Sequence, residues 1–130
     1  MEINSSQQQG RVPVMVFHLT GNLTNEEPLR SEVQRAYEAG MRYLLLDLTG
    51  VPYISSSGLR AINHAYMLLR QSEPPGSSKT IGQGIAAGTY HSPHLKLLNP
   101  SKRSLEVLSI AGFDMFLEVH KNLAEAVASF

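Results

Sequence analysis

The sequence of 130 residues contains no cysteine, so disulfide bonds, thiolate metal ligands and thiol chemistry are all excluded. It also has no excess of charge of either sign, because eleven lysines and arginines are matched by eleven aspartates and glutamates. A neutral chain carries no general electrostatic footprint for nucleic acid and no acidic tail. We therefore expect neither nucleic-acid binding nor redox chemistry.

Long apolar runs are missing as well. No segment approaches the roughly 20 apolar residues of a membrane-spanning helix, and the polar start, residues 1–10, lacks the apolar centre of a signal peptide. We expect a cytoplasmic protein without a membrane span. The length fits one domain over residues 1–130 with a core of its own, and no internal repeat divides it.

Apolar periodicity divides most of the chain into alternating strands and helices. Residues 42–48 form a continuous apolar run, which is typical of a strand covered on both faces. Pro13 favours an edge position or a strand start for the first strand. Strands are predicted at residues 12–19, 42–48, 94–98 and 115–119, and helices at 26–39, from the serines near 55 to 70–71, from 99–101 to 112, and at 122–130.

This alternation predicts an α/β fold with a central, mostly parallel sheet of 4–5 strands flanked by about four helices. Pro100 is expected near the first turn of its helix, with Leu105, Leu108 and Ala111 on the buried side. Residues 72–93 interrupt the pattern with three prolines, four glycines and several serines. We interpret them as a flexible loop, with a short strand near residues 80–87 as the one regular element considered there.

Three serines and a glycine, residues 55–58, stand directly between a predicted strand and a predicted helix. The N-terminus of a helix has unpaired N–H groups and the positive end of the macrodipole, so it favours an anion. A serine there can cap the helix, which is its ordinary use, or it can carry a phosphate. With Ser56 or Ser57 as the cap, at least one hydroxyl stays free.

Evidence for catalysis or for a metal site is weak. Five histidines are present without a carboxylate cluster or cysteine beside them, so solvated or capping roles are favoured over metal ligation. Gly82–Gly88 has the wrong spacing for a nucleotide-binding loop. Residues 55–58 lack the preceding glycine of a nucleophile elbow, no histidine–aspartate pair stands out by spacing, and Asp47 is expected to accept N–H bonds from a turn. We predict no enzyme, no metal and no cofactor.

The segment Leu44–Leu59, LLLDLTGVPYISSSGL, resembles the signature of STAS domains, a family that includes anti-sigma factor antagonists and the tails of sulfate transporters. In that signature a strand ends in an aspartate or asparagine, and Asp-Ser-Ser-Gly-Leu opens a helix. The resemblance extends to Phe17–Leu23 and to the segment from Leu97 to Phe113, so it covers nearly the whole chain.

The resemblance implies a bacterial binding module that regulates transcription and is switched by phosphorylation. Its partners would be an anti-sigma factor with serine-kinase activity and a serine phosphatase. Ser56 aligns with the phosphoacceptor of the family, and Ser57 and Ser55 are the alternative acceptors. The partner-binding residues implied by the alignment are Asp47, Ser55, Ser56, Ser57, Gly58 and Arg60.

The chain departs from the family pattern at two places. Ser55 stands where the family has its acid, and the 72–93 loop is longer and richer in glycine than the usual connection. The first departure leaves open an alternative: a STAS scaffold that does not switch, in a multiprotein assembly such as a stressosome-like or lipid-transport complex. A third interpretation is a nucleotide or another small anion bound at the helix start. The oligomeric state and the identity of the partner are not indicated.

Overall fold

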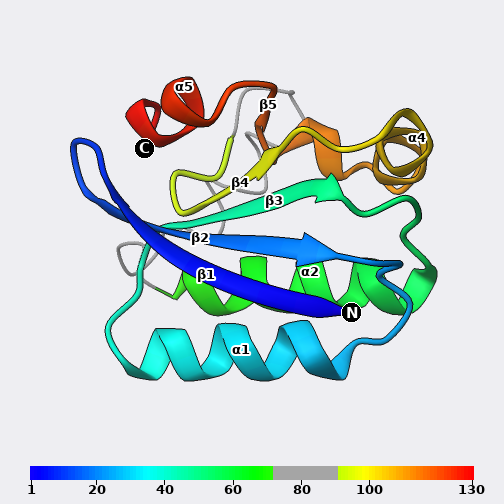
Figure 1. The fold of residues 1–130 in the computed structure, drawn as a ribbon, viewed down its shortest axis with the longest axis horizontal. Coiled ribbons are helices and arrows are strands. Elements are labelled where there is room, and N and C mark those ends of the chain that lie inside the picture. Colours follow the sequence, from blue (N-terminus) through cyan, green and yellow to red (C-terminus); the bar gives the residue numbers. More distant parts are fainter. Residues whose placement is uncertain (72–90) are drawn as a thin grey trace.

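The computed structural model describes residues 1–71 and 91–130, and these form one five-stranded sheet with helices on both faces (Figure 1). The strand order follows the chain, β1-β2-β3-β4-β5, with β1 antiparallel to β2 and the other three pairs parallel. The mostly parallel sheet predicted from the sequence is confirmed. The strands are β1 Glu2–Gln9, β2 Pro13–Thr20, β3 Leu44–Gly50, β4 Leu95–Leu98 and β5 Val119–His120.

Two long helices lie side by side under one face of the sheet (Figure 1). On the other face the short α5 packs against the strands, close to β4 and β5. Within the described residues the helices are α1 Glu27–Glu38, α2 Ser56–Arg70, α4 Lys102–Ile110 and α5 Leu123–Ala128, and a 3₁₀ turn, η1, lies at Phe113–Met115. In the described part of the chain, no helix is long and apolar enough to span a bilayer.

Strand alternation divides the apolar side chains between two cores. Phe17 and Leu46 point toward α1 and α2 and belong to the larger core, which also includes Leu108 of α4. Val16 and Leu45 point the other way, into a smaller core closed by Val127 of α5. The cover on both faces that the apolar run of β3 predicts is confirmed for this part of the sheet.

The face that carries α5 becomes polar toward the carboxyl ends of β2 and β3. The residues that follow Val16 and Leu45 on this face are His18, Asp47 and Thr49. The antiparallel register brings Ser6 of β1 opposite Val16 and Asn4 opposite His18. This half of the face, which we call the polar half-face (Asn4, Ser6, His18, Asp47 and Thr49), therefore contains hydroxyl, imidazole and carboxyl groups in place of a core.

The first strand was not predicted. β1, residues 2–9, is EINSSQQQ, and it contains neither the apolar alternation nor the β-branched run by which strands are recognised. It is a strand because all eight of its residues pair with β2. Pairing with β1 also makes the edge position expected for β2 wrong, whereas Pro13 does stand at the start of its strand.

Several predicted boundaries are wrong near the C-terminus. Residues 113–115 form a 3₁₀ turn, so the strand predicted at 115–119 is reduced to Val119–His120. Pro100, which was expected near the first turn of its helix, directly precedes the capping residue of α4, Ser101. Leu108 is buried as expected, but Leu105 and Ala111 are exposed and the small Ser104 takes the other buried position.

The predicted 72–93 loop lies mostly outside the described residues, as does the short strand considered at 80–87. Its last part is described and is fixed in place: Ser92 is buried and its N–H donates to the carbonyl of Phe116 at 2.8 Å.

One buried lysine joins the C-terminal segment to the sheet. Lys96 of β4 is 3% exposed, and its Nζ donates to the carbonyl oxygen of Ser129 at 2.8 Å and to Oγ of Ser129 at 3.0 Å. It also forms an ion pair with Glu118 at 3.1 Å and lies 5.0 Å from the ring centroid of Phe130. Burial raises the pKa of Glu118, but hydrogen bonds and charge from Lys96 and His120 outweigh this effect and keep that pKa below its ordinary value.

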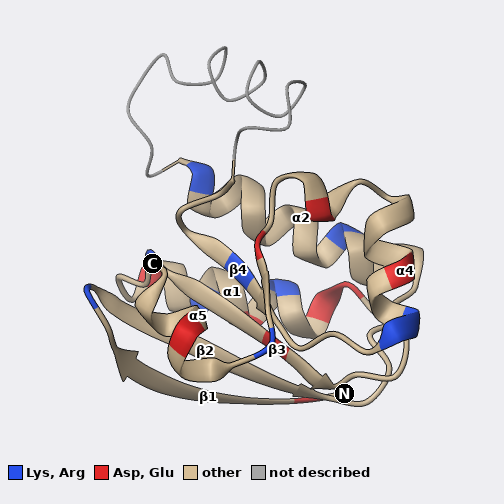
Figure 2. Ribbon diagram, turned by 90° about the horizontal axis from the view of Figure 1, so that it is seen from above, with Lys and Arg blue, Asp and Glu red and all other residues tan. Residues whose placement is uncertain are grey.

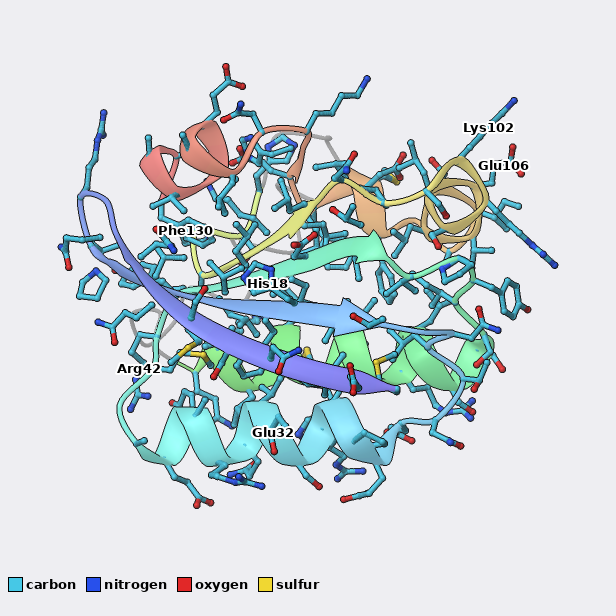
Figure 3. All side chains as sticks on the ribbon, viewed as in Figure 1. His18, Glu32, Arg42, Lys102, Glu106 and Phe130 are labelled. Carbon is cyan, nitrogen blue, oxygen red and sulfur yellow. The ribbon has the colours of Figure 1, made fainter. Side chains whose placement is uncertain are left out.

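We expect Lys96→Met to lower the free energy of unfolding by about 1–3 kcal/mol, because the partners of a buried ammonium are left unsatisfied. Urea unfolding followed by circular dichroism measures the change. Lys102→Met is the matched control, since Lys102 points into solvent from α4 (Figure 3). Equal stability of the two variants would contradict the structural role of Lys96.

Candidate functional site

The turn between β3 and α2, residues 51–55, leads into the three serines, and we call it the serine turn. Hydrogen bonds to Leu23, which is distant in sequence, hold it in place. The N–H of Leu23 donates to the carbonyl of Tyr53, and the N–H of Ser55 donates to the carbonyl of Leu23, each at 2.9 Å. Leu23 and Ile54 pair as an isolated parallel bridge, and both are fully buried. The backbone of Leu23 therefore fixes the position of the serines.

The N-terminus of α4 supports the same turn from the other side. Oγ of Ser104, which is fully buried, donates to the carbonyl of Val51 at 3.2 Å. Oγ of Ser101 donates to the carbonyl of Pro52 at 3.4 Å. Nothing in the sequence marked Leu23, Ser101 or Ser104 as part of the site, because each contact joins segments about 30 to 50 residues apart.

The residue that caps α2 is Ser55, so the prediction of Ser56 or Ser57 as the cap is wrong. Ser55 has an extended backbone, φ −88° and ψ 176°, and its Oγ accepts a hydrogen bond from the N–H of Gly58 at 3.3 Å. That hydroxyl also donates to the carbonyl of Leu23 at 3.4 Å. The position at which the family signature has an acid is thus the N-cap, where serine and aspartate are both preferred.

The other two serines differ in accessibility. Ser56 is exposed in the first turn of α2, and within the described residues its hydroxyl has no hydrogen-bond partner. Ser57 is half-buried, and its Oγ accepts a hydrogen bond from Nη2 of Arg60 at 2.9 Å. Arg60 also lies 3.7 Å from a carboxylate oxygen of Glu26, at the start of α1. Of the three hydroxyls, that of Ser56 is the one without a structural role.

Gly58 is required by close packing. A Cβ at this position would lie 2.3 Å from the carbonyl oxygen of Leu23, 2.8 Å from its Cγ and 2.9 Å from Cγ2 of Ile54. The first of these contacts is to backbone that is itself hydrogen-bonded to Ser55. The glycine of the motif therefore lets α2 begin directly against residue 23.

Asp47 is oriented toward the polar half-face. Its Oδ1 accepts from the N–H of Thr49 at 3.0 Å and from the Thr49 hydroxyl at 2.6 Å. Asp47 thus accepts a backbone N–H as expected, but the donor lies at the end of β3 and not in a turn. Its Oδ2 lies 2.7 Å from Nδ1 of His18. Burial raises the pKa of Asp47, but the hydrogen bonds from Thr49 and then those from His18 outweigh it, so the pKa lies below its ordinary value of 3.8. Its role in partner binding stays a prediction.

Within the described residues, no group of three or more histidines, aspartates or glutamates is arranged to hold a metal ion. Acidic and basic residues lie interspersed over the helices and the connecting segments (Figure 2). The site around Ser56 consists of hydroxyls, N–H groups at a helix start and one arginine.

We expect Gly58→Ala to lower the free energy of unfolding by about 1–3 kcal/mol through overpacking. Alanine is otherwise the better helix former by up to about 1 kcal/mol, so a net loss shows that the contact with Leu23 dominates. Urea unfolding measures it, with Ser56→Ala as the matched alanine variant that has room for its side chain. A Gly58→Ala variant as stable as wild type would contradict the close contact.

We expect the stabilisation contributed by Asp47 to depend on pH. Because its pKa is lower in the folded than in the unfolded chain, the ionised carboxyl stabilises the fold above pH 3.8, and this contribution is lost as pH falls through the folded pKa. The difference in unfolding free energy between wild type and Asp47→Asn should therefore shrink in acid. Urea titrations from pH 7 to pH 3 measure it, with the exposed Glu106→Gln as control. A constant difference would contradict this view.

The site can be compared with those of known proteins. The STAS domain model matches residues 5–73, slightly more than half of the chain. The matched segment contains the polar strand β1 from Ser5 onward, Leu23, the serine turn that Leu23 holds, and all of α2. A comparison with curated protein sequences found no match.

Two solved structures have the same fold. The anti-sigma factor antagonist SpoIIAA in its unphosphorylated form is 15% identical, with a TM-score of 0.61, over 96% of this chain and 93% of that one. An anti-sigma factor antagonist from Mycobacterium paratuberculosis is 14% identical, with a TM-score of 0.58, over 98% of this chain and 93% of that one. Fold, serine turn and family model agree, and the chain belongs to the STAS domain family.

Proposed function

We propose that this protein is a regulatory binding module of the anti-sigma factor antagonist type, switched by phosphorylation of Ser56. The observation that carries the proposal is that the three serines differ in their hydrogen bonds and in their exposure. Ser55 caps the helix and Ser57 is bonded to Arg60, whereas Ser56 is exposed and free of hydrogen bonds within the described residues. A kinase can reach the Ser56 hydroxyl without breaking any contact of the turn.

A phosphate on Ser56 adds a charge of about −1.5 to −2 and three acceptor oxygens. The first turn of α2 has N–H groups without helical partners, and the helix dipole favours the added charge. The turn itself is held through backbone atoms of Leu23 and through Ser101 and Ser104, none of which the phosphate replaces. Phosphorylation would thus change the surface and leave the fold in place.

The partner in this proposal is an anti-sigma factor with serine-kinase activity, in a bacterial cytoplasm, and a serine phosphatase reverses the modification. The unmodified protein binds the anti-sigma factor through residues 55–58 and Arg60, with Asp47 as the further predicted contact residue. The modified protein does not bind, because the new charge and volume lie within the contact surface.

The test is a kinase assay with the anti-sigma factor kinases of the same genome, followed by mass spectrometry of the modified residue. We expect phosphate on Ser56 in wild type and none in Ser56→Ala. Ser57→Ala serves as the matched control and should still be modified at Ser56. Phosphate found only outside residues 55–57 would contradict the proposal.

A second candidate function is a STAS scaffold that does not switch. The observation that favours it is the neutral cap, since Ser55 supplies no charge where the family signature has an acid. Equal affinity of one partner for wild type, Ser56→Ala and Ser56→Asp would support the scaffold. Ser55→Asp separates the two functions further, because it restores the acid and keeps a good N-cap.

A further inference from the structure

Three adjacent strands place a hydroxyl, an imidazole and a carboxylate in line on the polar half-face. Oγ of Ser6 in β1 lies 3.1 Å from Nε2 of His18 in β2, and Nδ1 of His18 lies 2.7 Å from Oδ2 of Asp47 in β3. These residues are 12 and 29 positions apart along the chain, so sequence spacing did not indicate the arrangement. All three residues lie outside the serine turn. Ser6 and His18 take no part in the proposed switch, whereas Asp47 is also one of its predicted contact residues.

The two ring nitrogens of His18 have the partners that a general base requires, with the carboxylate at Nδ1 and the Ser6 hydroxyl at Nε2. The carboxylate of Asp47 accepts hydrogen bonds only, so the imidazole proton belongs on Nδ1, and Nε2 is left to accept the proton of the Ser6 hydroxyl. The other oxygen of Asp47 is fixed by the hydroxyl and N–H of Thr49, which keep the carboxylate aimed at His18. Nucleophile, base and orienting acid are recognised by this geometry and by their roles, not by sequence order.

A donor for a developing oxyanion lies next to Ser6. The N–H of Met15 donates to the carbonyl of Tyr43, the residue before β3, so the backbone groups of the neighbouring residue Val16 face β1. Val16 pairs with Ser6, and the backbone groups of Ser6 therefore point inward. The N–H of Gln7 points to the outer edge of the sheet, where no further strand pairs with β1 among the described residues. The N–H of the residue after the nucleophile is a usual oxyanion donor.

The group is also accessible. The side chain of His18 is 39% exposed and Ser6 is half-buried. Figure 3 shows His18 on the side of the sheet opposite to α1 and α2. On that side α5 packs over Val14, Val16 and Leu45, toward the other end of the strands, and leaves His18 partly open.

We propose that Ser6 is an activated nucleophile that reacts with small aryl esters and with fluorophosphonates. His18 is its general base, and Asp47 is the positioning residue. With an aryl acetate, Oγ of Ser6 forms a bond to the acetyl carbon, the bond from that carbon to the aryl oxygen breaks, and the hydroxyl proton passes through Nε2 of His18 to the leaving phenoxide. Water then cleaves the acetyl ester of Ser6, with His18 again taking and returning the proton.

The first experiment incubates the full chain with a fluorophosphonate probe and maps the adduct by mass spectrometry. The P–F bond breaks, fluoride leaves, and the phosphonyl group should be found on Ser6. Ser5→Ala is the matched control, because Ser5 is the neighbouring exposed serine and points to the opposite face of the strand. We expect full labelling of Ser5→Ala and none of Ser6→Ala. An adduct on another residue, or none at all, would overturn the proposal.

The second experiment measures hydrolysis of p-nitrophenyl acetate. Ser6→Ala and His18→Gln should each be about 100-fold slower than wild type, the usual contribution of general-base catalysis, while Ser5→Ala keeps the wild-type rate. Circular dichroism verifies the fold of each variant, and Ser6→Ala tests the proposal even if His18→Gln does not fold. A wild-type rate in folded Ser6→Ala would contradict the proposal. The phosphorylation of Ser56 is measured separately and stands or fails on its own.

Discussion

The backbone of Leu23 is the contact on which the arrangement of the candidate site depends. Its carbonyl accepts the N–H of Ser55 and its N–H reaches Tyr53, so the segment after β2 and the turn after β3 become one unit. Gly58 is in van der Waals contact with the same carbonyl, which sets where α2 begins. Cap, exposed serine and helix direction all follow from this contact. Since it joins backbone to backbone, it requires little of the side chains around it, and the turn can vary in sequence while its shape is kept.

The two faces of the sheet differ in polarity. The face under α1 and α2 is apolar along β2, β3 and β4 and contains the larger of the two cores. The other face is apolar only under α5, where the buried Lys96 fastens the C-terminal segment. Beyond that point it turns polar, and its side chains bond to one another. The serine turn lies at the carboxyl ends of the parallel strands, where open α/β sheets usually place their binding residues. The proposed phosphoacceptor Ser56 lies beyond the end of β3, whereas the hydrogen-bonded Ser6–His18–Asp47 group lies on the face of the sheet.

Much of this fold could be predicted from the sequence because apolar runs and turn residues report burial directly. β3 and α2 are examples: the run at residues 44–48 and the spacing of Ile62, Tyr66 and Leu69 give their type and their buried sides. β1 could not be predicted, because its polar residues form a strand only through their pairing with β2. The choice of Ser55 as the cap depends on the position of Leu23, which no local pattern contains. The approach of His18 to Asp47 and Ser6 depends on strand order, and strand order is a property of the whole chain.

The neutral cap affects how much phosphorylation of Ser56 would change the charge of the surface around it. Between Gly50 and Arg60 the chain has no acidic residue, and the carboxylate of Glu26 is paired with Arg60, which also bonds to Ser57. In the proposed switch, the surface around the unmodified Ser56 is close to neutral, and phosphorylation adds a charge of about −1.5 to −2. A family member with an acid at the cap begins from a negative surface, so its two states differ less in relative terms. Replacing that acid by serine would sharpen the contrast between the two states while the helix keeps its cap.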